Sequence, residues 1–143
     1  MKLVQHLLDS KGREIISITA DASVLDAIKM MAERAIGSLL VMQGDELLGI
    51  VTERDYARKV IVKGRSSKST AVGEIMTEKV RTATIQDTVN NCMTIMTERK
   101  IRHLPVVDDG KVVGLISIGD LVQAIISDQQ EEIEHLEHYI SGQ

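Results

Sequence analysis

The chain has 143 residues, 43% of them hydrophobic, and a net charge of −4, with Cys92 as its only cysteine and Tyr56 and Tyr139 as its only aromatic residues. These features exclude an intrachain disulfide and a cysteine metal cluster, and they argue against a nucleic-acid partner, which needs a basic surface or stacking rings. No apolar run approaches the roughly 20 residues that span a membrane, and the N-terminus lacks a signal-peptide core, so we expect a cytoplasmic protein with no membrane partner.

The first half of the chain follows a βαββα pattern. Residues 15–18 form an apolar, β-branched run typical of a strand. Ser23 and Asp26 then give the Ser-x-x-Asp pattern of a helix start, and the apolar residues that follow recur at the spacing of one helix face. The predicted elements are, in order, a lead-in helix over 3–8, a strand over 15–18, a helix from 23 on, strands over 38–42 and 47–51, and a helix over about 52–62.

The second half repeats the first at an offset of 65 residues without a gap. The matching pairs include Val24 and Val89, Met31 and Met96, Ile36 and Ile101, Leu39 and Leu104, Gly49 and Gly114, and Asp55 and Asp120. The elements expected there are a short helical turn over 72–76, a helix through Val89 and Met96, strands over 103–107 and 111–116, and a helix over about 117–127. Such regular self-similarity indicates a tandem duplication.

Two residues of the second copy carry expectations of their own. Cys92 takes the place of Ala27, which favours a small buried residue over a reactive thiol. Pro105 lies within a strand run, and because proline cannot donate to a ladder, that strand is predicted to lie at a sheet edge there.

The composition divides the chain into four parts: 1–64, the first repeat with its lead-in; 65–76, a linker; 77–127, the second repeat; and 128–143, an acidic helical extension. The extension is amphipathic, with Ile133, Leu136 and Ile140 on one stripe. His135 and His138 stand beside glutamates, which favours a solvated helix over a metal site.

One polar motif occurs twice. Thr52-x-x-Asp55 and Ser117-x-x-Asp120 each join the end of a strand to the start of a helix, and both are capping boxes by spacing. The same geometry suits a ligand, because a helix N-terminus and a hydroxyl can bind phosphate while a carboxylate accepts from ribose hydroxyls. The two interpretations are compatible, since a cap can yield to a ligand.

The duplicated βαββα order, the run Ile101-Arg102-His103-Leu104-Pro105-Val106-Val107 and the two glycine–apolar–apolar–Thr/Ser–x–x–Asp motifs resemble a CBS domain pair, also called a Bateman module. The resemblance covers about residues 10–127. It implies an α/β fold of the α+β type, a tandem pair of CBS repeats with pseudo-twofold symmetry. It also implies a homodimer and an adenosine-containing ligand (AMP, ADP, ATP, NAD or S-adenosylmethionine), with no required cofactor.

In that family each cleft combines the Asp motif of one repeat with the first strand and hairpin entry of the other. Carried onto this chain, the resemblance places one cleft between Thr52, Arg54, Asp55 and Val80, Arg81, Arg102, His103, and the other between Ser117, Gly119, Asp120 and Ile16, Gly37, Ser38. Asp55 and Asp120 would hold ribose hydroxyls, Thr52 and Ser117 would contact phosphate, and the backbone near Ile16 and Val80 would sandwich adenine.

The two clefts are expected to differ in charge. The first has Arg54, Arg102 and His103 where the second has Gly119, Gly37 and Ser38, so polyphosphate should prefer the first. A basic run surrounds the linker and is either a solvated face or a further set of phosphate contacts; its members are Arg58, Lys59, Lys63, Arg65 and Lys68.

Three functions are open from the sequence. The first is a stand-alone adenine-nucleotide sensor that acts on an unknown protein partner, and the second is a scaffold or oligomerisation module whose motifs are only caps. The third, an enzyme, is disfavoured because no nucleophile–base pair or metal cluster is evident.

Overall fold

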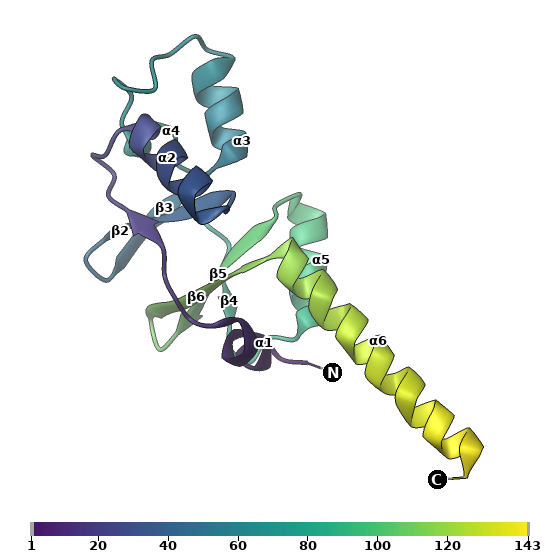
Figure 1. Ribbon diagram of the computed structural model, residues 1–143. Coiled ribbons are helices and arrows are strands. Elements are labelled where there is room, and N and C mark those ends of the chain that lie inside the picture. The colour runs from purple at the N-terminus through teal and green to yellow at the C-terminus, as the bar shows by residue number, and fades with distance from the viewer. Residues whose placement is uncertain (1, 143) are drawn as a thin grey trace. The chain divides into compact units, whose positions relative to one another are not determined.

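The computed structural model describes residues 2–142. Figure 1 shows the elements of the chain in order. They are α1 (Val4–Lys11), β1 (Ser17–Ile18), α2 (Val24–Arg34), β2 (Ser38–Gln43), β3 (Glu46–Thr52), α3 (Glu53–Tyr56), the π-helix η1 (Ala57–Ile61), α4 (Val72–Ile75), β4 (Ala83–Thr84), α5 (Val89–Arg99), β5 (His103–Asp108), β6 (Lys111–Ser117) and α6 (Ile118–Ser141). None of the described helices is long and apolar enough to cross a membrane.

The helices α2 and α5 occupy equivalent places and are built alike. The side chain of Ser23 accepts from the Asp26 N–H at 3.1 Å, and that of Thr88 accepts from the Asn91 N–H at 3.0 Å, so a hydroxyl residue caps each helix. Both helices are 11 residues long and end at a residue in the left-handed region. The duplication predicted from the sequence is therefore confirmed at the level of local structure.

Each repeat contains a three-stranded mixed sheet. The strand orders are β1-β2-β3 and β4-β5-β6, with β1 parallel to β2, β4 parallel to β5, and β2 antiparallel to β3. The first strand is shorter than predicted, because only Ser17 and Ile18 pair with β2 and Ile15 is 37% exposed. The mixed α and β content in two repeats confirms the predicted fold class.

The predicted edge position of the Pro105 strand is wrong. β5 is the middle strand of its sheet, between β4 and β6. Proline is tolerated there because β4 pairs only with Val106 and Val107. In the first repeat the equivalent residue, Leu40, donates its N–H to the Ile16 carbonyl at 3.3 Å, a bond that a proline cannot make.

The chain separates into two compact units. One contains residues up to Arg13, Thr82–Asp108 and the chain from Val113 on, and the other contains Glu14–Arg81 with Asp109–Val112. We call them the second-repeat unit and the first-repeat unit. The boundaries predicted near residues 64 and 76 stay predictions.

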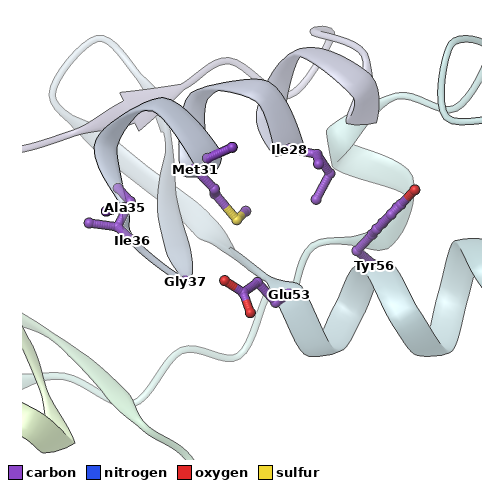
Figure 2. Close-up of a pocket in the computed structure, with 8 residues that line it drawn as sticks. Ile28, Met31, Ala35, Ile36, Gly37, Glu53 and Tyr56 are labelled. Atoms are coloured by element: carbon purple, nitrogen blue, oxygen red, sulfur yellow. The ribbon is translucent and has the colours of Figure 1, made fainter.

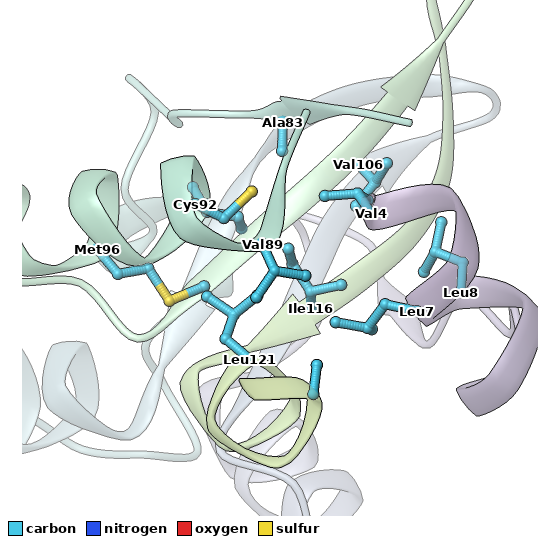
Figure 3. Close-up of a cluster of buried hydrophobic side chains, with 12 residues drawn as sticks. Val4, Leu7, Leu8, Ala83, Val89, Cys92, Met96, Val106, Ile116 and Leu121 are labelled. Atoms are coloured by element: carbon cyan, nitrogen blue, oxygen red, sulfur yellow. The ribbon is translucent and has the colours of Figure 1, made fainter. Parts of the chain in front are cut away.

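The N-terminal helix α1 packs in the core of the second-repeat unit, although it precedes the first repeat in the chain. Val4, Leu7 and Leu8 belong to the same buried cluster as Val89 and Leu121 of that unit (Figure 3). The short helix α4 is placed in the reciprocal way, because its apolar residues join the core of the first-repeat unit. Each repeat is thus completed by the helix that precedes the other one.

Cys92 is fully buried in the same core (Figure 3), as predicted. Burial, and then the negative charge of Asp87, raise the pKa of its thiol to about 11. The thiol is therefore protonated and inaccessible in the native state, which is the small-core-residue interpretation rather than the reactive one.

The two motif glycines allow close packing. A Cβ at Gly49 would lie 2.6 Å from the Thr77 carbonyl oxygen, and a Cβ at Gly114 would lie 2.7 Å from Leu8 Cδ2. These glycines therefore bring the strands that carry the motifs against the segment after α4 and against α1.

The helices that follow the motifs differ in length. After Thr52 the chain forms four α-helical residues and then the π-helix η1, whereas α6 continues without a break for 24 residues. The second helix and the C-terminal extension, predicted as separate segments, are one helix.

Candidate functional site

The first motif is a capping box at the junction of β3 and α3. The Thr52 hydroxyl oxygen accepts from the Asp55 N–H at 3.1 Å, and Asp55 Oδ2 accepts from the Thr52 N–H at 3.0 Å. The Thr52 hydroxyl also lies 3.2 Å from Asp55 Oδ2 as a donor. Asp55 is 7% exposed, so the motif carboxylate is held in a fixed position at the end of the strand.

The second oxygen of Asp55 has partners as well. Lys59 Nζ lies 3.1 Å from Asp55 Oδ1, and the Thr77 hydroxyl donates to the same oxygen at 3.4 Å. Thr77 is brought there by two backbone hydrogen bonds with Ile50, and Lys59 also donates to the Ile75 carbonyl. The contact of Lys59 with Asp55 could have been predicted from the sequence, because residues at i and i+4 lie on the same face of a helix. The contact of Thr77 could not, because it depends on the placement of α4.

The second motif has the same cap. The Ser117 hydroxyl oxygen accepts from the Asp120 N–H at 3.2 Å, and Asp120 Oδ2 accepts from the Ser117 N–H at 2.8 Å. Here the cation comes from α1. Lys11 Nζ lies 2.6 Å from Asp120 Oδ2 and donates to the Leu115 carbonyl at 2.7 Å. Lys11 could not be found from the sequence as a partner of this motif, because 109 residues separate it from Asp120.

The ion pair with Lys11 stabilises the negative charge of the second motif. Burial by itself would raise the pKa of Asp120, but the hydrogen bonds from Lys11 and Ser117 outweigh it, and the pKa lies below its ordinary value. Asp120 is therefore ionised at neutral pH. Burial, followed by the positive charges of Lys11 and Arg102, lowers the pKa of the nearby His103 despite the opposing effect of Asp120. His103 is therefore neutral at pH 7 and can accept a hydrogen bond.

Each motif lies beside the hairpin entry of its own repeat. The Glu53 N–H donates to the Gly37 carbonyl at 3.1 Å, and Ser38 pairs with Thr52 across the sheet. In the other repeat the Ile118 N–H donates to the Arg102 carbonyl at 2.9 Å. The backbone at these entries is thus fixed to the first turn of the motif helix.

The predicted site residues fall into two groups. Those in the first-repeat unit are Ile16, Gly37, Ser38, Thr52, Arg54, Asp55, Val80 and Arg81, and those in the second-repeat unit are Arg102, His103, Ser117, Gly119 and Asp120. Within each unit the structure brings the cap residues and the strand entry together. The two clefts, each of which draws residues from both units, stay predictions.

The residues of the basic run around the linker differ in their contacts and exposure. Arg65 pairs with Glu74 at 2.6 Å, and a backbone hydrogen bond from Ala71 together with this pair lowers the pKa of Glu74. Arg58 and Lys63 are exposed on and just after η1. The predicted phosphate contacts of Arg58, Lys63 and Arg65 are not tested by these positions.

A hollow of about 480 Å³ opens between α2 and α3 in the first-repeat unit, and Figure 2 shows Glu53 and Tyr56 on one side of it and Met31 on the other. Three of the residues that line it are small, namely Ala32, Ala35 and Gly37. The equivalent positions of the second repeat carry the larger residues Thr97, Lys100 and Arg102, and the counterpart of Tyr56 is Leu121, which is fully buried. The two repeats therefore differ in shape as well as in charge.

Metal binding has no support among residues 2–142, where no group of three His, Cys, Asp or Glu side chains could hold an ion. His135 and His138 lie on the exposed part of α6.

Comparison with known proteins agrees with the repeat architecture. The family model for the CBS domain matches residues 11–62 and 72–127. This chain is 44% identical to the mitochondrial CBS domain-containing protein CBSX3 of Arabidopsis thaliana. The match covers 97% of this chain and 72% of the relative.

Solved structures give the same result. A candidate signal-transduction protein with CBS domains from Burkholderia ambifaria MC40-6 is 55% identical, with a TM-score of 0.87 over 90% of this chain and 96% of its own. The CBS domain pair of protein MJ0100, crystallised with 5′-methylthioadenosine and S-adenosyl-L-methionine, is 27% identical, with a TM-score of 0.79 over 90% of this chain and 98% of its own. The family matches cover both repeats, so this chain belongs to the CBS-domain family as a tandem CBS pair.

Proposed function

We propose that the chain is a regulatory module that binds an adenosine-containing ligand, AMP, ADP, ATP or an NAD-type molecule, and signals through a ligand-dependent change of conformation. The observation that carries the proposal is the pair of buried or half-buried carboxylates, Asp55 and Asp120, each held at a strand end by a hydroxyl cap and a lysine. One relative, the MJ0100 pair, was crystallised with two adenosine derivatives, which supports this class of ligand.

The proposed contacts use the chemistry of each motif. A ribose offers two hydroxyl donors, and an ionised carboxylate offers acceptors to both. Asp120 is ionised at neutral pH, and Lys11 and Ser117 stabilise its charge. Thr52 and Ser117 have hydroxyl groups that can turn from the cap toward a phosphate oxygen. Arg54, Arg81 and Arg102 are the cations proposed to neutralise phosphate in the first cleft.

The lysines leave the expected inequality of the clefts in place. The second cleft has Gly119, Gly37 and Ser38 where the first has Arg54, Arg102 and His103. Each motif carboxylate has one lysine partner, Lys59 at Asp55 and Lys11 at Asp120, so the lysines add the same charge to both motifs. We therefore propose two unequal sites, with polyphosphate preferring the first.

A scaffold without ligand is the second candidate, and one observation favours it. Both motif carboxylates already have capping and lysine partners, so neither requires a ligand for its hydrogen bonds. Under the first proposal a ligand must replace these contacts, and under the second they are permanent. We propose no catalytic activity; the relatives are named for CBS domains or for signal transduction.

The sensor proposal includes a homodimer and a protein partner that reads the conformational change. The expected cytoplasmic location also stays a proposal, and the word mitochondrial in the name of the Arabidopsis relative makes an organelle the alternative.

Ligand-induced shifts in melting temperature, measured for Asp55→Asn, Asp120→Asn and the wild type, separate the two candidates. A ligand at about 100 times its Kd stabilises the native state by about 2.7 kcal/mol. We expect AMP, ATP or NAD to raise the melting temperature of the wild type, and each variant to lose part of that shift.

The matched control is Thr88→Ala, which removes a helix cap outside both motifs and costs about 1 kcal/mol without changing a proposed ligand contact. The control should melt lower than the wild type but keep the full ligand shift. Equal ligand shifts in the wild type and both Asp variants would remove these carboxylates from the site, and no shift in the wild type would favour the scaffold.

A further inference from the structure

The second half of α6 has no partner within its own unit. The buried residues of this helix are Leu121 and Ala124, in its first two turns, and every residue over 129–142 is exposed. Figure 1 shows the yellow end of α6 extending away from β4, β5 and β6, the strands of the same unit. This half continues a helix that is already nucleated in the core, and its apolar side chains are left without cover in their own unit.

The exposed apolar residues of α6 follow a heptad. The aliphatic ones are Val122, Ile126, Ile133, Leu136 and Ile140, exposed by 43, 49, 54, 60 and 82%, whereas Tyr139, exposed by 85%, falls outside the pattern. Ile126, Ile133 and Ile140 fall on one heptad position, a, and Val122 and Leu136 fall on the other, d, with Gln129 as the polar member. A strict a/d pattern with a 3.5-residue period is the seam of a coiled coil rather than the wider apolar face of a core helix. We call these six residues the α6 seam.

The charges beside the seam favour one orientation of two copies. In a parallel pair, Glu132 at position g would face Glu137 at position e of the second copy on both flanks, which is repulsive. In an antiparallel pair centred near residue 131, Glu137 instead faces Gln123, and Ile125 faces Tyr139. The only like-charge contact left is Glu132 with its own copy at the centre.

The same antiparallel register fits the seam. Ile140 of one copy meets Val122 of the second, Leu136 meets Ile126, and Ile133 meets Gln129. The most exposed end of each helix, Ile140 and Tyr139, is thereby placed against the first turns of the other helix, where Ile125 is already partly buried. The remaining acidic residues, Asp128, Glu131 and Glu134, fall on the outer positions, where Asp128 pairs with Lys2 at 3.5 Å.

We propose that α6 is the docking surface for a second copy of this chain and forms an antiparallel two-stranded coiled coil with it. This deepens the homodimer part of the proposed function, and it holds with or without a bound nucleotide. A parallel pair, or a foreign helix on the seam, are alternative outcomes of the experiments below.

The oligomeric state tests the seam. We compare the wild-type chain with the double variant Ile133→Glu/Leu136→Glu by sedimentation velocity at tens of micromolar. The matched control is His135→Glu/His138→Glu, which adds the same two charges at outer positions of the same turns. We expect the wild type and the control to sediment as dimers and the seam variant as a monomer, with loss of helical circular dichroism from the exposed end of α6.

Two results would overturn the proposal in different ways. A seam variant that stays dimeric places the dimer interface elsewhere and leaves the homodimer intact. A monomeric wild type removes both the homodimer and the seam, while ligand shifts measured on the same sample still decide the nucleotide proposal. The two failures are therefore distinguishable.

Cysteine cross-linking tests the orientation. The native Cys92 is fully buried, so introduced cysteines react selectively. In the antiparallel pair, Gln130 lies next to Gln130 of the second copy, whereas the two Ile140 side chains are about 27 Å apart along the axis, 18 residues at 1.5 Å each. We expect Gln130→Cys to form a disulfide dimer on mild oxidation and Ile140→Cys not to. A disulfide in Ile140→Cys, or none in Gln130→Cys, would overturn the antiparallel arrangement.

Discussion

Replacing Lys11 with methionine tests the link between α1 and the second motif. Methionine keeps an unbranched apolar stem but removes the ammonium group that contacts Asp120 Oδ2 at 2.6 Å and the Leu115 carbonyl at 2.7 Å. The side chains of Lys11 and Asp120 are 37 and 24% exposed, so solvent screens the pair in part. We therefore expect a loss of about 1 kcal/mol in the free energy of unfolding, near the upper end for exposed pairs.

The dependence of this loss on pH follows from Asp120. Its pKa in the folded chain is lowered below the ordinary 3.8, so the contribution of the carboxylate is present above pH 3.8 and is lost as the pH falls through the folded pKa. The difference between the wild type and Lys11→Met should thus be full at pH 7 and shrink in strong acid.

Urea unfolding at pH 7 measures the loss, and a chain of this size should also melt about 3 °C lower. The control is Lys29→Met, which removes an exposed lysine of α2. If Lys11→Met unfolds at the same urea concentration as the wild type, or loses no more stability than Lys29→Met, the contact of Lys11 with Asp120 does not stabilise the native state.

Three further predictions concern packing, the buried thiol and pH. Gly49→Ala should lower the free energy of unfolding more than Gly114→Ala does. The new Cβ would lie 2.6 Å from the rigid Thr77 backbone carbonyl in the first variant and 2.7 Å from a leucine methyl group in the second. Urea unfolding should show a loss of about 1–3 kcal/mol for Gly114→Ala, and equal losses in the two variants would contradict this expectation. Cys92 should react with a thiol reagent at pH 8 only after the protein unfolds, because burial raises its pKa to about 11; fast reaction of the native chain would show an open core. Burial and the charges of Lys11 and Arg102 lower the pKa of His103 in the folded chain, so as the pH falls the unfolded chain binds a proton at His103 before the folded chain does. The free energy of unfolding of the wild type should therefore fall as the pH drops below the ordinary value of 6.5. The free energy of unfolding of His103→Gln should fall less between pH 7.5 and 5.5, and parallel curves for the two proteins would contradict the assignment.

Features with a local cause could be predicted from the sequence. The capped start of α2 follows from the Ser23-x-x-Asp26 pattern, and the caps of both motifs follow from a hydroxyl residue three positions before an aspartate. Because the motif occurs in both repeats, the pattern found in one repeat could be checked at the same offset in the other.

Features that depend on which segments meet could not be predicted. The contact between Lys11 and Asp120 requires α1 to pack with the second repeat, and nothing near Lys11 in the sequence indicates that exchange. The position of Pro105 in a middle strand has a similar origin, because it depends on how far the short β4 extends along β5.

The lysines also change the interpretation of the motifs. From spacing, cap and ligand contact are compatible roles for Asp55 and Asp120. In the structure each carboxylate binds a cap and a cation at once, so a ribose that binds there has to compete with a lysine. The free energy of ligand binding is therefore reduced by the contacts that it replaces.

Binding of an adenosine-containing ligand is measured by a calorimetric titration of the full chain with ATP at pH 7. We expect measurable binding heat that two unequal sites describe, with AMP competing for the same sites. Absence of heat at millimolar ATP, repeated with AMP and NAD, would contradict it and leave the motifs as caps.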